Sequence, residues 1–364
     1  MRKIPFFIIV MFLLAGCWDQ NQLKDNRLVN GISFDKADGS DDILGTVRAI
    51  NVRSAGAGNL DVKDEFYVAE NKTVSQLEVD LQNKVAGNMD VGKAFIMIVG
   101  SELAETKGLT PLIEPIIRST HGYISSRILI SEGPGNGILS LNIQESPIVF
   151  QIDTLLTGGI KDGYIPKHTL FTAWNEITDP TTDIILPYIK ADKADKLKLA
   201  GSALFNGDTF TGHTLTTSQT SLLLLLRNDS KKRTKISIDS DELSQPITLT
   251  VEKVKTNINV ENEDGKTTCT ITADFKGRLL SYYEDKSNKS IKTLNGIASR
   301  ELTKQLKELT DLLLKADSDA LGIAKYLSTA DPESWNPDTW KQDYQHVVFK
   351  PKVTVDLIGT NNLR

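Results

Sequence analysis

The sequence predicts a multi-domain α+β fold of two to three domains, with mixed or antiparallel sheets and helices packed on one face. Residues 247–275 alternate apolar and polar side chains, as half-buried strands do. Residues 291–316 keep apolar side chains at helical spacing. Residues 73–130 alternate helical patterns with short apolar runs, which is typical of an α/β or α+β unit.

The N-terminus has the pattern of a bacterial lipoprotein signal. Arg2 and Lys3 precede an apolar run from Ile4 to Leu14, and two small residues separate this run from Cys17. In such proteins Cys17 receives a diacylglyceryl thioether and an N-acyl group after residues 1–16 are removed. The run is too short to span a bilayer, which needs about 20 residues. The chain is therefore expected to be exported and held on membrane lipid through acylated Cys17, and the alternative is an ordinary signal peptide with a chance cysteine.

Composition indicates a globular protein and disfavours nucleic-acid binding. The 364 residues are 40% hydrophobic and 24% charged. Loss of Arg2 and Lys3 takes the formal net charge from −5 to −7, whereas nucleic-acid binding usually needs a basic surface. Of the two cysteines, Cys269 has no partner in the chain if Cys17 is acylated. Its alternating segment favours a buried small side chain over a reactive thiol.

Residues 17–195 are expected to form an N-terminal α/β region of one or two subdomains. Strands are predicted over 29–34 and 43–52, followed by a mobile loop from Arg53 to Asp64. Thr73 begins a capping box for a helix, and Ser101 is expected to cap a short helix after a strand over 94–99. A helix over 109–117 and a strand over 127–130 follow. Residues 131–166 are expected to be irregular and hinge-like, although 148–156 can form a helix.

Residues 196–364 are expected to form a C-terminal α+β domain. Strands are predicted over 197–205, 247–260, 269–275 and 349–357, and helices over 217–226, 291–316, 321–327 and 337–344. The helix at 217 is expected to be capped by Thr216 or Thr217. The apolar side chains switch from odd-numbered to even-numbered positions between Val251 and Val254. Such a switch needs one extra residue in the strand, so a β-bulge is predicted near Glu252. Within the 291–316 helix, Leu302 and Leu306 are expected to be buried.

The residues give no basis for an enzyme, a metal site or a cofactor. The four histidines are scattered and none has metal-ligand spacing with another histidine or cysteine. No nucleophile motif occurs. The acidic runs Asp35–Asp42 and Glu261–Asp264 are interpreted as solvated hairpin turns. The glycine-rich run Gly133–Gly137 is interpreted as a flexible loop, because it does not open a helix directly after a strand.

A few residues are candidates for contact with a partner protein or with lipid headgroups. The basic group after the 217–226 helix could contact an acidic partner, although a solvated loop is the alternative. Trp340 and Tyr344 share one face of a predicted helix and could form an exposed aromatic contact, although packing on the C-terminal sheet is the alternative. The loop from Arg53 to Asp64 is a further candidate. The candidate contact residues are Arg227, Lys231, Lys232, Arg233, Trp340 and Tyr344.

Several motifs in order resemble one known family. Gly16-Cys17-Trp18-Asp19 opens the mature chain, Gly201 to Asp208 reads GSALFNGD, and Leu223 to Arg227 reads LLLLR. Asp319 to Ile323 and the strand ending near Gly359 follow. Together these motifs are similar to the C-subunit lipoproteins of spore germinant receptors, the Ger(x)C family. The chain departs from the family pattern at His213-Thr214, where a more apolar continuation is usual.

The resemblance implies a non-catalytic subunit of a nutrient germinant receptor. Such subunits act with transmembrane A and B subunits on the outer face of the cytoplasmic membrane, which is the inner membrane of the spore. The family fold is α+β, commonly in three domains. The alternative function is a solute-binding lipoprotein that delivers a ligand to a transporter, and an envelope hydrolase is a third. Solute-binding lipoproteins usually have two similar α/β lobes, whereas the two halves of this chain do not repeat each other.

Overall fold

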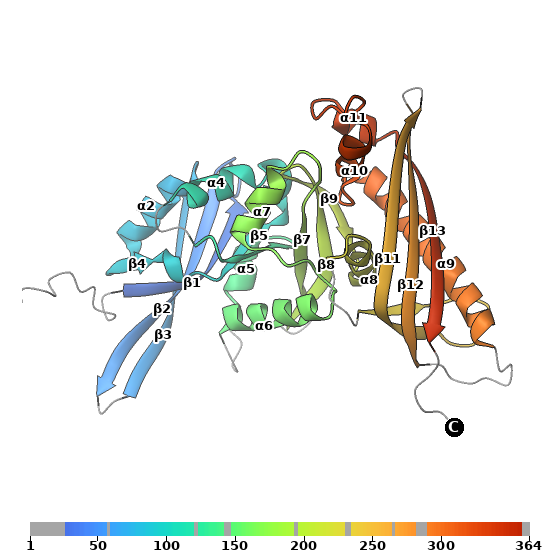
Figure 1. The fold of residues 1–364 in the computed structure, drawn as a ribbon. Helices are drawn as coiled ribbons and strands as arrows, with labels where there is room; N and C mark the ends of the chain where they lie inside the picture. The colour runs from blue at the N-terminus through green and yellow to red at the C-terminus, as the bar shows by residue number, and fades with distance from the viewer. Residues whose placement is uncertain are drawn as a thin grey trace, which may run out of the picture.

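The computed structural model contains two mixed sheets joined by a helical layer (Figure 1). It describes residues 26–56, 59–119, 123–141, 147–192, 196–229, 234–263, 266–281 and 290–358. Within these residues no helix has both the length and the apolar character needed to cross a membrane. The predicted multi-domain α+β class with mixed sheets is confirmed.

The N-terminal sheet has nine strands in the order β3-β2-β1-β5-β6-β7-β8-β9, with β4 beside β1. Strands β1, β5, β6 and β7 run parallel, and the outer strands are antiparallel to their neighbours. The strands are β1 (Asn26–Lys36), β2 (Ile43–Gly56), β3 (Asn59–Asn71), β4 (Asn88–Asp90), β5 (Ile96–Gly100), β6 (Arg127–Ser131), β7 (Ile185–Asp192), β8 (Lys196–Asn206) and β9 (Thr209–Leu215).

Helices cover both faces of this sheet. Neighbouring residues of β5 enter different cores: Met97 packs with the helices on one face, and Ile98 with those on the other. One face carries α2 (Val74–Lys84), α3 (Ser101–Thr106), α4 (Thr110–Arg118) and α7 (Leu170–Ile177), and the opposite face carries α5 (Gly135–Leu139) and α6 (Ile148–Lys161). The expected placement of helices on one face therefore does not hold for this sheet.

Several local predictions in this half differ from the structure. The segment from Arg53 to Asp64, predicted as a loop, lies mostly in the β2–β3 hairpin, where Arg53 pairs with Asp61. In the region 131–166, predicted as irregular, the possible helix over 148–156 is confirmed as part of α6, whereas α5 was not predicted. Ser101 does not cap α3, because its hydroxyl accepts a hydrogen bond from the Gly133 amide at 3.1 Å and the cap position is Gly100. The Thr73 cap of α2 is confirmed.

The C-terminal sheet is formed by β10 (Lys235–Ile238), β11 (Ile247–Glu263), β12 (Lys266–Ser281) and β13 (Val348–Ile358), in that order. The register of β11 shifts between Val251 and Lys253, so the predicted bulge is confirmed. The helices of this half are α8 (Thr217–Leu226), α9 (Ile291–Lys315), α10 (Ile323–Ala330) and α11 (Trp340–Tyr344). Thr216 caps α8 in a capping box with Gln219.

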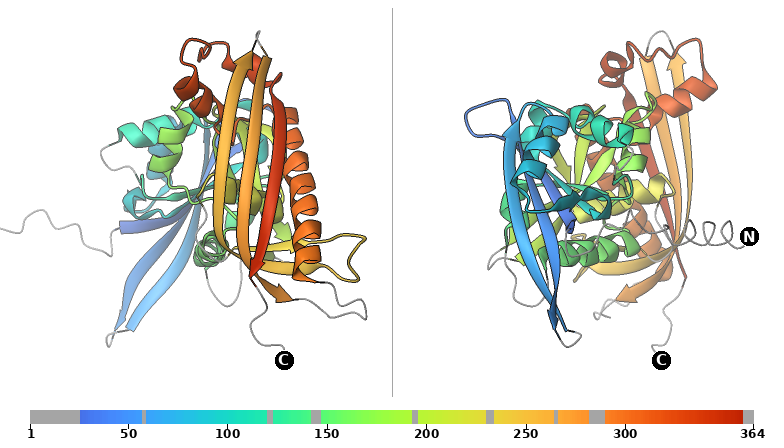
Figure 2. Two further views of the ribbon diagram at one scale, coloured as in Figure 1. Left: turned by 45° about the vertical axis from the view of Figure 1, so that its right-hand side comes forward. Right: turned by 90° about the vertical axis from the view of Figure 1, so that its left-hand side faces the viewer.

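Helix α9 lies alongside β13 (Figure 2). Together with α8 it packs on one face of the C-terminal sheet. Leu302 and Leu306 are both 0% exposed, as predicted. The polar side chains Asn295, Ser299 and Thr303 accept hydrogen bonds from the amides of Leu357, Val355 and Val353 in β13. Because β13 ends the sheet, α9 satisfies amides that an open edge strand would offer to another chain.

The boundary predicted near residue 195 falls between β7 and β8, which pair within the N-terminal sheet. The chain passes to the second sheet only after β9, through α8. Leu222 to Leu226 of α8 are buried in one core with Ile185 of β7 and Leu249 of β11. The division into independently folding domains remains a prediction, and the two sheets share this helical layer.

Candidate functional site

Four of the candidate residues lie outside the described part of the chain. Cys17 precedes the first described residue, Asn26, and Lys231, Lys232 and Arg233 fall between Asp229 and Thr234. Three candidates are described: Arg227, Trp340 and Tyr344. All three lie where the N-terminal sheet meets the C-terminal domain, and none offers a free surface to a partner.

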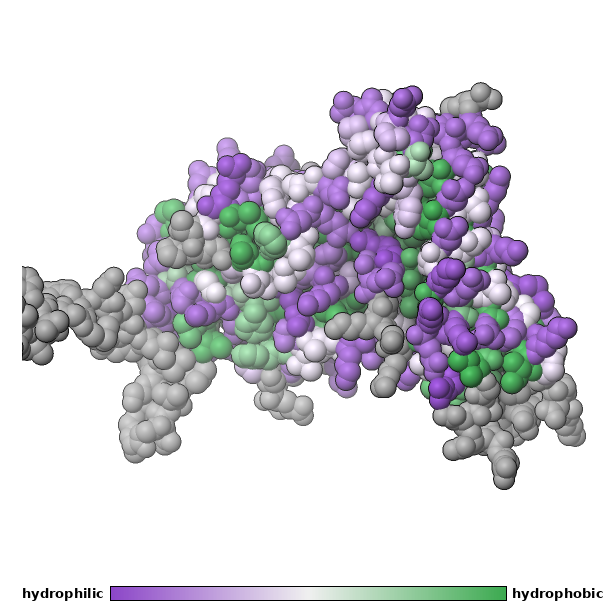
Figure 3. Space-filling view, in the orientation of Figure 1, coloured by the Kyte–Doolittle hydropathy of each residue, from purple (hydrophilic) through white to green (hydrophobic). Residues whose placement is uncertain are grey.

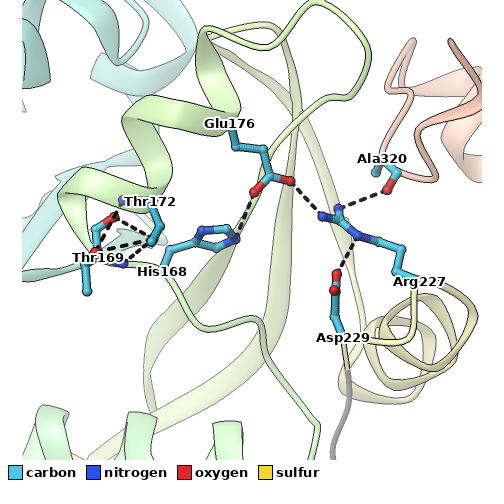
Figure 4. Close-up of polar contacts among 7 residues, drawn as sticks. All are labelled: His168, Thr169, Thr172, Glu176, Arg227, Asp229 and Ala320. Atoms are coloured by element: carbon cyan, nitrogen blue, oxygen red, sulfur yellow. Dashed lines mark hydrogen bonds and ion pairs between the residues drawn. The ribbon is translucent and has the colours of Figure 1, made fainter. Parts of the chain in front are cut away.

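Arg227 forms an internal ion-pair network at this junction (Figure 4). It ends α8, and its guanidinium lies 2.8 Å from Glu176 of α7 and 2.7 Å from Asp229. A third N–H donates to the carbonyl oxygen of Ala320 at 3.1 Å. The side chain is 19% exposed. The expectation that Arg227 is a partner contact is therefore corrected: its N–H groups connect α8 to α7 and to the segment before α10.

His168 completes the network from the N-terminal side. Its Nε2 lies 3.4 Å from Glu176, on the carboxylate oxygen that does not contact Arg227. Burial lowers the pKa of His168, although the neighbouring Glu176 carboxylate opposes this shift. No group of three or more metal-ligating side chains occurs among the residues that the structure describes.

We predict that Arg227→Met destabilises the full chain by about 2–3 kcal/mol, because it removes hydrogen bonds to charged groups and leaves Glu176 poorly solvated. The matched control is Arg300→Met, which breaks an ion pair to Glu242 between side chains that are 59% and 54% exposed and should change stability little. Urea unfolding followed by circular dichroism measures both. Equal effects of the two substitutions would show that the junction network adds no stability.

Trp340 and Tyr344 are buried, with 5% and 1% of their surface exposed. Their rings lie 5.9 Å apart, and Tyr344 makes an edge contact with Phe349 of β13. The Trp340 indole N–H donates to Asp319 at 3.1 Å, and the Tyr344 hydroxyl donates to the Ser318 carbonyl oxygen at 2.8 Å. The expectation of an exposed aromatic contact is therefore corrected, since both rings pack in the C-terminal core.

Asp319 is the centre of a second polar cluster at the junction. Its carboxylate accepts hydrogen bonds from the amides of Ile323 and Ala324 at the start of α10, besides the Trp340 indole. Burial raises the pKa of Asp319 to about 8, although these N–H donors oppose the shift. The sequence analysis did not predict that Asp319 accepts hydrogen bonds from the first amides of α10. The available signal was that Asp319 lies three residues before Gly322, which precedes an apolar helical run.

Asp183 connects the same cluster to the N-terminal sheet. Its carboxylate accepts hydrogen bonds from the amides of Gly207, in the β8–β9 turn, and of Asp319, at 2.6 and 2.7 Å. The Asp183 amide donates in return to the Asp319 carbonyl oxygen at 3.1 Å. Asn206 donates to Asp317 beside it. The bonds from Asp183 to Asp319 and from Asn206 to Asp317 join residues 136 and 111 positions apart in the chain. They hold the C-terminal domain against the start of β7 and the β8–β9 turn.

Among the described residues, three clefts lie along this junction. One of about 300 Å³ is lined by His168, Glu176 and Arg227. One of about 510 Å³ lies between the 179–182 loop, β11 and α10, and one of about 220 Å³ is lined by Asp183, Asp319 and Lys341. Their carboxylates already accept protein hydrogen bonds. The geometry therefore indicates that these side chains hold two parts of the chain together.

In many α/β proteins, ligands bind at the carboxyl ends of the parallel strands. In this protein a side chain of the chain itself, that of Asp35, fills this position. Asp35 follows the parallel part of β1 and accepts hydrogen bonds from the amides of Gly135 and Asn136 at 2.5 and 2.8 Å. It is 2% exposed, so the interpretation of Asp35 as part of a solvated turn is wrong. The interpretation of Gly133–Gly137 as a flexible loop is also wrong, since Gly135 begins α5.

Comparison with known proteins places the whole chain among spore germination proteins. The model for the spore germination protein N-terminal domain matches residues 19–191, and the model described as spore germination B3/GerAC like, C-terminal, matches residues 200–361. Spore germination protein GerQC of Bacillus cereus is 24% identical, and the match covers 100% of this chain and 99% of that protein. Spore germination protein KC of Bacillus subtilis (strain 168) is 18% identical, with 98% and 93% covered.

A solved structure shows the same fold. The crystal structure of the GerBC protein superposes with a TM-score of 0.57 at 16% identity, and the match covers 93% of this chain and 100% of that one. The arrangement of two sheets around a helical layer is therefore shared over nearly the full length.

Proposed function

The chain belongs to the Ger(x)C family of spore germination proteins, and we propose that it is a non-catalytic, lipid-anchored subunit of a nutrient germinant receptor. In this role it works with transmembrane A and B subunits to trigger germination. The observation that carries the proposal is the match to the N-terminal and C-terminal germination models in that order, over residues 19–191 and 200–361. The expected location is the outer face of the cytoplasmic membrane, which is the spore inner membrane.

The described geometry supports action by contact. At the junction, Arg227 pairs with Glu176 and Asp229, and the carboxylates of Asp183 and Asp319 accept hydrogen bonds from backbone amides. The end of the parallel sheet is filled by Asp35. The two halves also differ in architecture, one a sheet covered on both faces and the other a sheet covered by α9, whereas a solute-binding lipoprotein usually has two similar lobes around a cleft.

The test of the receptor role is a spore that lacks this gene. The deletion should abolish or slow germination in response to one class of nutrient, while triggers that bypass nutrient receptors keep working. Complementation with the unchanged gene should restore the response. A normal response to every nutrient, in a strain without a second receptor of overlapping specificity, would contradict the receptor role. Turnover of a substrate by the purified chain would contradict the non-catalytic role.

The lipid anchor has its own test at Cys17. We predict that cells expressing the unchanged chain incorporate labelled palmitate into it, and that Cys17→Ala abolishes this label, because the thiol is the acceptor of the diacylglyceryl group. Cys269→Ala is the matched control and should keep full labelling, since Cys269 is buried. Equal labelling of the unchanged chain and Cys17→Ala would refute lipidation at this residue.

A further inference from the structure

Three large apolar side chains are exposed near one end of the N-terminal sheet. Phe150 at the start of α6, Phe171 at the start of α7, and Ile124 in the segment before β6 are 44%, 50% and 40% exposed. Figure 3 shows apolar side chains over α7 and over α6 on the same face of the molecule, with other side chains between them. Neither Phe150 nor Phe171 is a buried member of the cores described above.

The backbone brings these side chains to the beginnings of β5 and β6. The Phe171 amide donates to the Ile124 carbonyl oxygen at 3.0 Å. Phe95 directly precedes β5, and its ring lies 5.3 Å from that of Phe150. The amide of Arg127, the first residue of β6, donates to the Phe95 carbonyl oxygen at 2.9 Å. Ile124, Phe171, Phe95 and Phe150 therefore all lie near the N-terminal ends of these strands.

The same end of the sheet receives the chain from Cys17. Strand β1 runs parallel to β5, with Gly31 opposite Ile96, so its first residue, Asn26, lies toward the end at which β5 and β6 begin. Only residues 18–25 separate Asn26 from Cys17. Even fully extended, they reach about 30 Å. A lipid on Cys17 therefore keeps Asn26, the residue at this end of β1, within about 30 Å of the bilayer surface.

The arrangement fits a lipid surface better than a protein partner. A stable protein interface buries about 1,200–2,000 Å² over a complementary surface, whereas Phe150 and Phe171 lie on helices that cover opposite faces of the sheet. Phenylalanines that project singly can enter the boundary between headgroups and acyl chains, where apolar groups bury about 5–10 Å deep. The adjoining charges suit that boundary, since Lys93 is exposed beside Phe95 and Arg127 pairs with Asp153.

We propose that this end of the N-terminal sheet docks on the bilayer, with Phe150, Phe171 and Ile124 inserted among the lipid headgroups. The proposal rests on the lipid anchor at Cys17, which restricts the chain to the membrane surface. Docking gives the tethered chain a fixed orientation, so that its remaining surfaces face neighbouring membrane proteins in a defined way.

The test uses the full lipidated chain in vesicles of phosphatidylcholine and phosphatidylglycerol. A fluorescent label is attached at Phe150→Cys or Phe171→Cys, and the control label at Val348→Cys, a 36% exposed residue at the start of β13. Cys17 carries lipid, and Cys269 is buried with a thiol pKa raised to about 12, so neither reacts with the label. Quenching by nitroxide lipids should be about threefold or more stronger at positions 150 and 171 than at 348.

Each other outcome has a defined meaning. Equal quenching at positions 150, 171 and 348 on vesicle-bound chain would overturn the docking and leave the Cys17 anchor intact. Strong quenching that requires co-reconstituted transmembrane subunits would assign this face to a protein partner and overturn the bilayer proposal. Absence of the chain from the vesicles, with no lipid on Cys17, would overturn the anchor and the docking together.

Discussion

Replacing Leu302 with aspartate should prevent the C-terminal domain from folding. Leu302 lies in the middle of α9, is 0% exposed, and belongs to the core that joins α8 and α9 to the C-terminal sheet. An aspartate there would bury a charge with no opposite charge beside it, which costs several kcal/mol or more. The milder Leu302→Ala should lower the free energy of unfolding by about 2–5 kcal/mol through a cavity.

Urea unfolding of the full chain, followed by far-ultraviolet circular dichroism, measures both Leu302 substitutions. Lys304→Ala is the matched control on the exposed face of the same helix and should stay within about 0.5 kcal/mol of the unchanged chain. Retention of the normal unfolding curve by Leu302→Asp would show that α9 does not pack in the observed register.

The sequence predicts the C-terminal half well because its elements are half buried. Strands with one solvated face alternate apolar and polar residues, and a helix on one face of a sheet shows one apolar stripe. The β11 bulge was predictable for the same reason, since a change of apolar parity between Val251 and Val254 requires an extra residue. The helix register that places Leu302 and Leu306 in the core follows from the same stripe.

In the N-terminal half, the predicted strands over 94–99 and 127–130 are confirmed as β5 and β6, because a short apolar run also indicates a strand buried on both faces. Strand β7 was not predicted, and it contains Pro187, a residue that usually argues against an interior strand. Pairing along the β2–β3 hairpin extends into a segment rich in glycine and alanine, which has the composition of a loop. In this segment the pairing between β2 and β3 determines the structure, because the local sequence is compatible with both a loop and a strand.

The candidate site shows a different limit of sequence reasoning. Arg227 and Trp340 are residue types that bind partners, but the partners in this structure are Glu176 and Asp319 of the same chain. Asp183 and Asp319 are 136 residues apart, so no local spacing relates them. The motif Asp319 to Ile323 marked the segment through family resemblance, whereas its role as a helix cap at the junction required the folded chain.

Substitution of Asp319 by asparagine should weaken this junction in a pH-dependent way. The amide would turn one N–H₂ group toward donors of the cluster, either the Ile323 amide or the pair formed by the Ala324 amide and the Trp340 indole. A buried donor that faces another donor costs about 1–3 kcal/mol. Asp338→Asn, at an exposed position before α11, is the control and should change stability little.

The pH dependence follows from the raised pKa of Asp319. Because burial raises this pKa to about 8 from an ordinary value near 4, the folded chain holds the proton more tightly than the unfolded chain. The stabilising contribution is therefore complete below about pH 4 and is lost as the pH rises towards 8. Asparagine cannot titrate, so the stability difference between the unchanged chain and Asp319→Asn should narrow from pH 5 to pH 8 in urea unfolding. A difference that is the same at both pH values would mean that Asp319 stays ionised in the folded chain and that its three N–H donors outweigh its burial.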